Sequence, residues 1–551
     1  MQRIIIYIFF WLCGIGSLSA YPKYELRAVW LTTIGGLDWP HSYAHDAISI
    51  RRQQQELCQI LDQLKRANIN TVLLQTRVRG TTIYPSAYEP YDGCLSGQPG
   101  KSPGYDALQF AINECHKRGM ELHAWVVTIP VGKWNKLGCR RLRATHPSML
   151  KRIGEEGYMN PESQLTADYL AMICEEITYK YDIDGIHLDY IRYPETWGGR
   201  VNRHTARANI TNIVRTIHQR VKRRKPWVKL SCSPIGKFDD LSRYRSYGWN
   251  AYSRVYQDAQ GWMREGLMDQ LYPMMYFRGE QFFPFALDWS ENSYGRSVSA
   301  GLGIYMLSPR EKNWDLAVIK REMAVARQIG LGHTYFRSKF FTDNVKGIYD
   351  FALLFDAYPA LVPPMPRAGA LAPLAPTQLT VQESSAGTLL TWNDGTNRSG
   401  GSYLTYNIYM SETYPVDIND AANLIAVRHP SKSISIRRTP NGHPVFYAVT
   451  AIDRYGIESA ALQSQQPMAQ ATFSSPLIAN DGRLLQIPQH LGATDAEYVA
   501  VFSMQGNIVK TLHYGSTADI SSLPEGVYVL KTLDRKGITH RLGQFIVKRH
   551  Q

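Results

Sequence analysis

Cysteine is scarce in this chain of 551 residues, and none of the seven cysteines has the spacing of a metal site. Four of them fall in predicted helices or strands, where a buried free thiol is the ordinary interpretation. Cys94 and Cys139 lie in predicted loops, where a disulfide and two free thiols both fit the sequence. We therefore expect no metal ion in this protein.

A glycine-rich phosphate loop is also missing. The glycines of TIGGLDWP, after the first predicted strand, precede a long loop instead of opening a helix. The formal net charge is +14, but the basic residues are scattered, and their densest cluster, at residues 222–225, ends a predicted helix and complements its dipole. We expect neither a nucleotide cofactor nor a nucleic-acid partner.

The sequence has no apolar run long enough to cross a bilayer. The apolar segment at residues 4–12 follows Arg3 and precedes small residues, which is the pattern of a cleaved signal peptide over residues 1–20. The mature chain is therefore expected to have no transmembrane segment. We expect it to be exported to the periplasm, the cell surface or the extracellular space.

What the sequence does contain, over residues 24–356, is a repeated strand and helix pattern. The candidate strands are residues 26–33, 71–77, 121–128, 185–189, 228–233, 270–276, 298–305 and 332–336. Helical patterns follow them at residues 50–66, 105–118, 163–179, 202–223, 251–265, 282–293, 312–328 and 343–355. This alternation predicts an α/β fold, a (β/α)8 TIM barrel, instead of an open doubly wound sheet.

The composition changes after the barrel. Closely spaced prolines predict a stiff linker over residues 357–376, and short alternating runs then predict two small all-β sandwich domains, at residues 377–468 and 472–551. The first, with Trp392 and YAVTAIDRYGIES, resembles a fibronectin type III module. The second, with VAVFSMQGNIVKTL and LPEGVYVLKT, resembles the sorting domain of the type IX secretion route, which implies surface attachment through the C-terminal domain.

The stretch DIDGIHLDYIRYP, residues 182–194, carries the strongest chemical signal. Alternation puts His187 and Asp189 on one face of a strand, and Asp189 lies where that strand runs into a loop. In TIM barrels this is the end that bears active sites, whereas Asp184 begins the strand at the structural end. Asp189 is thus the first candidate for a reacting carboxylate. The alternative is an aspartate that caps the loop or bonds Arg192.

Cleavage of a glycosidic bond needs a proton for the departing oxygen and a carboxylate that acts as nucleophile or base. Glu280, just past the sixth predicted strand, is the candidate catalytic partner of Asp189. Glu89, Asp239 and Asp240 are rivals from other loops. The separation of the two carboxyl groups decides between retention and inversion, and the sequence leaves both open.

Polar and aromatic side chains at or near the other strand ends form the predicted ligand-contacting set. Aromatic rings suit the faces of sugars, and basic or imidazole groups suit their hydroxyls. We expect substrate contacts from Arg77, His123, Trp125, His187, Arg192 and Tyr276.

Several strings together resemble glycosyl-hydrolase-like family 10, a family of peptidoglycan glycosidases. ELRAVWLTT matches its first strand, NTVLLQTRVRGTTIYPSAYEPYD its second strand and loop, ELHAWVV its third strand, GYMNP a turn, and DIDGIHLDYIRYP its fourth strand. Many members have an aspartate where Thr81 or Thr82 stands and a glutamine in place of Met274. These departures bear on the identity of the substrate more than on the reaction.

Two other barrel families offer comparisons at the fourth strand. The spacing of His187 to Asp189 resembles the Arg-x-Asp of α-amylase-type barrels, whose aspartate is the nucleophile. Chitinase-type barrels end this strand in DGxDxDxE, and Ile191 stands here in place of the glutamate that protonates the glycosidic oxygen. That loss argues against the chitinase mechanism.

These observations predict a secreted glycoside hydrolase that cleaves O-glycosidic bonds in a polysaccharide. The expected substrate is peptidoglycan glycan stripped of its peptides, or a related amino-sugar polymer. The alternative is a non-catalytic carbohydrate-binding protein of the cell surface, a barrel that has kept its groove and lost one acid.

Overall fold

The computed structural model describes residues 21–197, 201–244, 246, 248–366, 369–384, 387–398, 403–437, 445–464, 477–487, 496–503, 507–534 and 539–548. The predicted signal peptide, residues 1–20, lies outside the described residues. The chain divides into two compact units, of which one comprises residues 1–410, 418–440 and 448–462 and the other residues 411–417, 441–447 and 463–551. The barrel lies wholly in the first.

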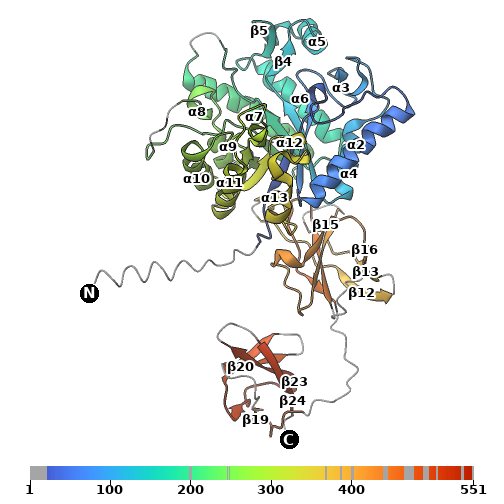
Figure 1. Ribbon diagram of the computed structural model, residues 1–551, viewed down its shortest axis with the longest axis vertical. Helices are drawn as coiled ribbons and strands as arrows, with labels where there is room; N and C mark the ends of the chain where they lie inside the picture. Colours follow the sequence, from blue (N-terminus) through green and yellow to red (C-terminus); the bar gives the residue numbers. More distant parts are fainter. Residues whose placement is uncertain are drawn as a thin grey trace, which may run out of the picture. The chain divides into compact units, whose positions relative to one another are not determined.

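Eight parallel strands close into a barrel, in the order β1-β11-β10-β9-β8-β7-β3-β2, which confirms the predicted TIM barrel (Figure 1). They are β1 (Arg27–Leu31), β2 (Thr71–Arg77), β3 (Glu121–Val127), β7 (Gly185–Asp189), β8 (Lys229–Cys232), β9 (Gln270–Leu271), β10 (Ser297–Leu302) and β11 (Gly332–Tyr335). β9 is much shorter than the strand predicted at residues 270–276. The reason is Pro273, which has no N–H for the ladder and leaves Met274 only isolated bridges.

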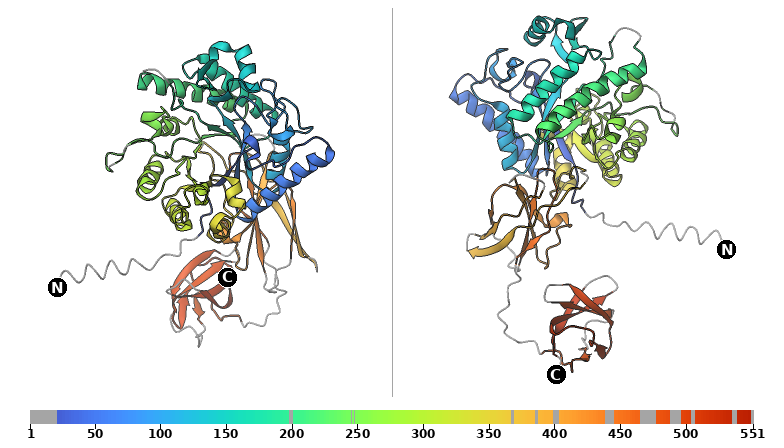
Figure 2. Two further views of the ribbon diagram at one scale, coloured as in Figure 1. Left: turned by 45° about the horizontal axis from the view of Figure 1, so that its top comes forward. Right: turned by 180° about the vertical axis from the view of Figure 1, so that it is seen from behind.

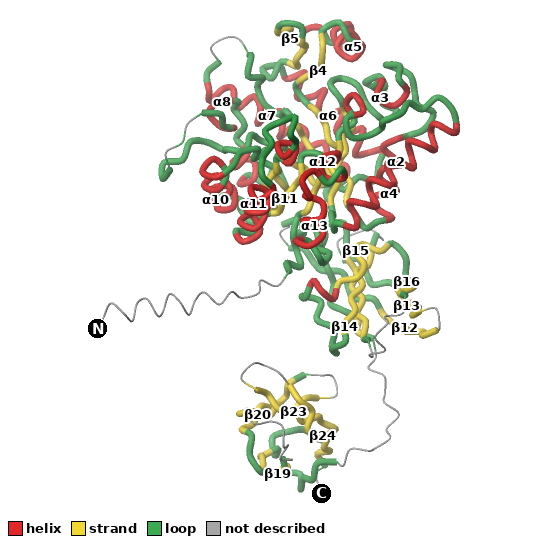
Figure 3. The backbone as a smooth tube through the Cα atoms, in the orientation of Figure 1, coloured by secondary structure: helices red, strands yellow, loops and turns green. Residues whose placement is uncertain are grey.

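Helices surround the strands, as the red coils around the yellow strands of Figure 3 show. They are α2 (Ala47–Arg66), α4 (Ala107–Lys117), α6 (Gln164–Lys180), α7 (Arg203–Arg224), α8 (Ala251–Arg254), α9 (Ala259–Arg264), α10 (Phe283–Glu291), α11 (Leu316–Gln328), α12 (Ser338–Thr342) and α13 (Ile348–Phe355). The single helix predicted at residues 251–265 is wrong. Tyr256 has a φ of 63°, which ends α8, and the Asp258 carboxylate then caps α9 at the Gly261 N–H.

The loops after β2 and β3 carry elements that the sequence pattern did not predict. They are α3 (Gly93–Ser96), β4 (Pro130–Lys133), α5 (Leu137–Thr145), β5 (Leu150–Ile153) and β6 (Glu156–Met159), and β4, β6 and β5 form a small antiparallel sheet. This sheet and α5 project from one end of the barrel (Figure 2). They enlarge the rim on the side where β2 and β3 end.

A buried ion-pair cluster closes the opposite end of the barrel. Asp356, after α13, lies 3.2 Å from Arg27 Nε, 2.6 Å from an Arg327 nitrogen and 2.9 Å from His333 Nε2. Oxygens of Glu25 and Asp356 and a nitrogen of His333 lie within 4.8 Å of one another, as in a metal site. Because both arginines donate into this space, the cluster is better described as a clamp between the first and last strands than as a cation site.

The chain after the barrel forms small all-β sheets, as predicted. One sheet has the order β12-β13-β16 and another β15-β14-β17-β18, from β12 (Thr377–Ser384), β13 (Gly387–Asn393), β14 (Thr405–Ser411), β15 (Leu424–His429), β16 (Ser433–Ile436), β17 (Phe446–Ile452) and β18 (Leu462–Gln463). The last sheets are β19-β22 and β21-β20-β23-β24, from β19 (Leu484–Gln486), β20 (Ala496–Ser503), β21 (Ile508–His513), β22 (Thr517–Asp519), β23 (Gly526–Asp534) and β24 (Thr539–Val547).

The structure also describes the two loop cysteines and the length of the helices. Cys94 and Cys139 are buried free thiols, so the disulfide alternative does not hold. None of the helices in the described part of the chain combines the length and the apolar composition that a bilayer crossing requires.

Candidate active site

Asp189 is the last residue of β7 and lies half-buried at the rim of the barrel. Its Oδ2 accepts a hydrogen bond from Trp125 Nε1 over 3.1 Å, and its Oδ1 accepts from Ser233 Oγ over 2.7 Å and from the Tyr190 N–H over 2.8 Å. Indole and backbone N–H groups only donate, and an ionised carboxylate only accepts. These three donors therefore fix the orientation of the Asp189 side chain at the rim, where a nucleophile or a base is required.

The strand register explains why these donors meet. β7 lies between β3 and β8, with Val127 opposite Asp189 and Cys232 opposite Leu188. Trp125 precedes that point of β3 by two residues, and Ser233 follows β8 directly. Donors on both sides of β7 thus form hydrogen bonds to the two carboxyl oxygens of Asp189.

An aromatic group lies beside the carboxylate. The ring centroid of Tyr276 lies 5.7 Å from that of Tyr305 and 5.3 Å from that of Phe336. The ring of Trp30 packs against Phe336, with 5.7 Å between their centroids. The Tyr276 hydroxyl is buried and has no hydrogen-bond partner among the described residues. Burial, followed by the charge of Asp189, raises the pKa of Tyr276 well above its usual value, so at neutral pH the hydroxyl remains a donor.

Arg192 is engaged with Glu195 and not with Asp189, so the alternative in which Asp189 bonds Arg192 is wrong, whereas Asp189 does accept from the Tyr190 N–H at the start of the loop. Its guanidinium lies 3.7 Å above the ring of Tyr190 and pairs with Glu195, whose other oxygen accepts from the Tyr190 hydroxyl over 2.7 Å. Burial opposes the ionisation of Glu195, but the hydrogen bond and charge of Arg192 outweigh it and lower its pKa. Glu195 is thus poorly suited to donate a proton.

The two predicted histidines lie inside the barrel. His187 is fully buried, with Trp30 Nε1 at 3.2 Å from its Nε2 and Ser231 Oγ at 3.1 Å from its Nδ1. Burial, and then His123, lower its pKa well below the usual range, so it is neutral. His123 is also fully buried, near the start of β3, with its Nε2 3.1 Å from Glu121. We therefore assign both to the support of the site and neither to ligand contact.

Arg77 is likewise buried and paired. Its Nε and one terminal nitrogen contact the two carboxylate oxygens of Glu89 at 2.8 and 2.7 Å, and both side chains are fully buried. Because Arg77 and Glu89 form hydrogen bonds to each other, Arg77 has no free pair of donors for a sugar. For the same reason Glu89 is a poor candidate for the acid that protonates the departing oxygen.

Glu280 lies in the 3-10 helix η3 (Gly279–Gln281), exposed, and its Oε2 accepts from the Tyr244 hydroxyl over 3.1 Å. No described contact joins it to Asp189, and catalysis does not require one, because the two carboxyl groups of glycosidases lie about 5 to 9.5 Å apart. Asp239 instead accepts from Ser253 over 2.6 Å.

The sequence interpretation overlooked Ser233 and the aromatic residues Tyr305 and Phe336. Ser233 and Phe336 follow barrel strands directly, and Tyr305 lies three residues past β10, all at the same rim as Asp189. Their places after β8, β10 and β11 were the available signal, since residues one to three positions past a barrel strand reach the active-site end.

Comparison with known proteins identifies the family of the barrel. Residues 25–306 match the family described as Glycosyl hydrolase-like 10. "Glycosyl hydrolase YngK" of Bacillus subtilis strain 168 is 30% identical over 485 residues, 80% of this chain and 93% of that protein. "Glycosyl hydrolase DigH" of Escherichia coli K12 is 30% identical over 287 residues, 46% of this chain and 65% of that protein.

Among solved structures, alpha-L-fucosidase isoenzyme 2 from Paenibacillus thiaminolyticus is similar at 15% identity, over 60% of this chain and 50% of that one, with a TM-score of 0.42, too low to support an inference. The family match and the long alignment with YngK confirm the resemblance drawn from the sequence strings. The chain belongs to the Glycosyl hydrolase-like 10 family and is a glycoside hydrolase.

Proposed function

We propose that this glycoside hydrolase cleaves O-glycosidic bonds in peptidoglycan glycan strands stripped of their peptides, or in a related amino-sugar polymer, with Asp189 as the reacting carboxylate. The observation that carries the assignment of Asp189 is its position: it is half-exposed at the rim, and Trp125 of β3 and Ser233, directly after β8, hold its two oxygens. The substrate class rests on the family resemblance.

In this mechanism Asp189 attacks the anomeric carbon or activates a water molecule, and Glu280 gives its proton to the departing oxygen. Trp125 and Ser233 orient the carboxylate, so that little reorganisation is needed when the bond breaks. Tyr276, which lies close enough to Asp189 to feel its charge, is the candidate for stacking on the sugar bound there. Arg192, half of an ion pair at the rim, contacts the sugar next to it.

The place of action is part of the proposal. A signal peptide over residues 1–20 would export the chain, and residues 472–551, which resemble a sorting domain, would attach it to the surface beyond a fibronectin type III-like module. An exported enzyme meets envelope polymers directly.

The test is release of short glycans from denuded peptidoglycan, followed by mass analysis. Asp189→Asn should lower the rate about 10³-fold or more, as removal of a reacting side chain does, while the melting temperature stays near that of the wild type. Asp168→Asn, on the outer side of α6, is the matched control and should retain full activity. Undiminished release by Asp189→Asn would overturn the assignment.

A further inference from the structure

A pocket of about 760 Å³ opens on the rim of the barrel, next to the strands that hold Asp189. It lies between the segment after β1, the segment after β2, and β4 with the start of α5. Its volume falls within the range of about 300–1,000 Å³ that is typical of ligand sites. Nothing in the proposed reaction at Asp189 uses it.

The pocket is joined to the reacting carboxylate by a short piece of chain. The Thr128 N–H and hydroxyl both donate to the main-chain carbonyl of Asp189, at 2.9 and 2.8 Å. β4 begins at Pro130 and supplies the next part of the pocket wall, from Val131 to Lys133. Only Ile129 and Pro130 separate Thr128, which contacts Asp189, from Val131 in the pocket wall, so a polymer that extends from Asp189 along this part of the rim reaches the pocket.

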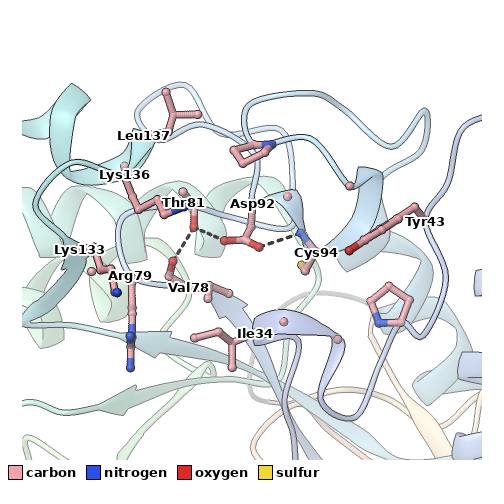
Figure 4. A pocket seen from close by; sticks show the side chains of 18 of the residues that line it. Ile34, Tyr43, Val78, Arg79, Thr81, Asp92, Cys94, Lys133, Lys136 and Leu137 are labelled. Atoms are coloured by element: carbon pink, nitrogen blue, oxygen red, sulfur yellow. Dashed lines mark hydrogen bonds between the residues drawn. The ribbon is translucent and has the colours of Figure 1, made fainter.

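Three basic side chains line this pocket, namely Arg79, Lys133 and Lys136, and Figure 4 shows them on one side of it with Tyr43 on the other. Within the described part of the chain, Arg79 and Lys136 form no ion pair, and Lys133 has only Glu155 at 3.9 Å, with both groups largely exposed. An ion pair this exposed is weak and leaves the charge of Lys133 largely available to a ligand.

The single carboxylate among the lining residues does not neutralise these charges. Asp92 accepts from the Thr81 hydroxyl over 2.7 Å with one oxygen and from the Cys94 N–H over 2.9 Å with the other (Figure 4). A concave surface with an excess of one charge concentrates its field on the bound ligand. The pocket therefore favours an anion.

Close glycine contacts bring the basic side chains together. A Cβ on Gly138 would lie 2.5 Å from the Gly80 carbonyl oxygen, and one on Gly80, where φ is +77°, would lie 2.8 Å from Val131 Cγ1. Only glycines allow the turn that carries Arg79 to pack this tightly against α5 and β4. Three cations from two segments, Arg79 after β2 and the two lysines at the end of β4 and just before α5, are thus held around one space, against their mutual repulsion.

The remaining wall suits a sugar ring. Tyr43 is 56% exposed, and Pro40 and Pro99 lie among the lining residues. Aromatic and proline faces offer apolar surface without further charge.

We propose that this pocket is a subsite for a sugar that carries a carboxylate, placed so that the acidic sugar is bound while a neighbouring glycosidic bond lies at Asp189. The inference rests on the proposed function and specifies its substrate class. The same chemistry occurs in the lactyl ether of muramic acid and in a uronic acid, and the experiment separates the two.

The first experiment compares denuded peptidoglycan glycan with the same glycan after its carboxylates have been reduced to alcohols. In the double variant Lys133→Glu/Lys136→Glu, KM for the acidic glycan should rise at least about 10-fold, with kcat within about twofold, and KM for the reduced glycan should not change. The preference of the wild type for the acidic glycan should weaken with added salt. Lys320→Glu/Arg321→Glu, on the exposed face of α11, makes the same change in net charge and should behave as the wild type.

The second experiment measures binding, so it stands even if no polymer is cleaved. Asp189→Asn protein is titrated with a peptide-free muramyl tetrasaccharide, an oligo-uronate of the same length and chitotetraose. We expect at least one acidic oligosaccharide to bind at least 10-fold more tightly than chitotetraose. This binding should be lost in the lysine double variant. Whichever acidic oligosaccharide binds identifies the source of the carboxylate. Equal binding of all three, or acidic binding that survives the double variant, would overturn the subsite, whereas absence of glycan release with acidic binding intact would overturn only the proposed reaction.

Discussion

The hydroxyl of Ser233, the residue directly after β8 on one side of β7, donates a hydrogen bond to Asp189 Oδ1 over 2.7 Å. Trp125 holds the other oxygen from β3 on the opposite side. A carboxylate fixed at both oxygens is preorganised for the transition state, because no donor has to be recruited as charge moves.

Ser233→Ala should therefore lower kcat for glycan release about 10- to 100-fold, with little change in KM. A hydrogen bond to a charged group is worth about 1.5–3 kcal/mol, and here it acts on the orientation of the reacting group. Ser233→Thr keeps a hydroxyl and should restore most of the rate. Equal losses in both variants would indicate a packing effect instead.

Glu280→Gln should lower the rate on natural glycan about 10²- to 10⁴-fold, since the departing oxygen loses its proton donor. An aryl glycoside whose leaving group needs no proton should be cleaved almost as fast by the variant as by the wild type. Comparison of kcat/KM on the two substrates checks this. A uniform loss, or none, would assign the acid to another side chain.

Glu322 should make the barrel less stable as the pH rises. Its carboxyl is buried on α11, neither oxygen has a hydrogen-bond partner among the described residues, and burial raises its pKa from 4.5 to about 9. Since the folded pKa exceeds the unfolded one, the folded state holds the extra proton. Its contribution to stability is complete below about pH 4.5 and is lost towards pH 9, by about 1.4 kcal/mol per pH unit.

Replacement of Glu322 by leucine should remove this slope and raise the melting temperature at pH 8 by several degrees. The measurement is thermal unfolding of the wild type and the variant between pH 5 and pH 9. Glu311→Gln, at an exposed position, is the control and should follow the wild type. Parallel curves for wild type and Glu322→Leu would contradict the expectation.

Asp356→Asn should destabilise the barrel by about 3–5 kcal/mol, because Arg27 and Arg327 would be left with one carboxylate at the closed end. Burial raises the pKa of Asp356, but the charges of His333 and then Arg27 outweigh it and lower that pKa below 3.8. The stabilisation is therefore present above about pH 4 and is lost as the pH falls through the folded value.

Chelation offers a separate check on the same cluster. If the arginines neutralise Glu25 and Asp356, addition of EDTA should leave the melting temperature of the wild type unchanged. A fall of several degrees that added divalent metal reverses would show a metal site in its place.

Local patterns in the sequence determined the barrel. The strands predicted at residues 71–77 and 185–189 match β2 and β7 to the residue, the first from an apolar run and the second from alternation of apolar and polar side chains. The same reasoning placed Asp189 at the open end of β7. It failed at residues 251–265, where the positive φ of Tyr256 divides a helical pattern.

Only the tertiary structure decided which side chains serve Asp189. Trp125 and Ser233 are 64 and 44 residues away in sequence, and the strand register brings them within 3.1 and 2.7 Å. Alternation predicts the face of a strand that a residue occupies but not its height along the barrel axis. His123, expected at the ligand, is for that reason buried beside Glu121, whereas Arg77 does lie at the strand end and is satisfied there by Glu89. The basic pocket is likewise formed by three segments that come together only in the folded chain, and no local sequence pattern predicts this.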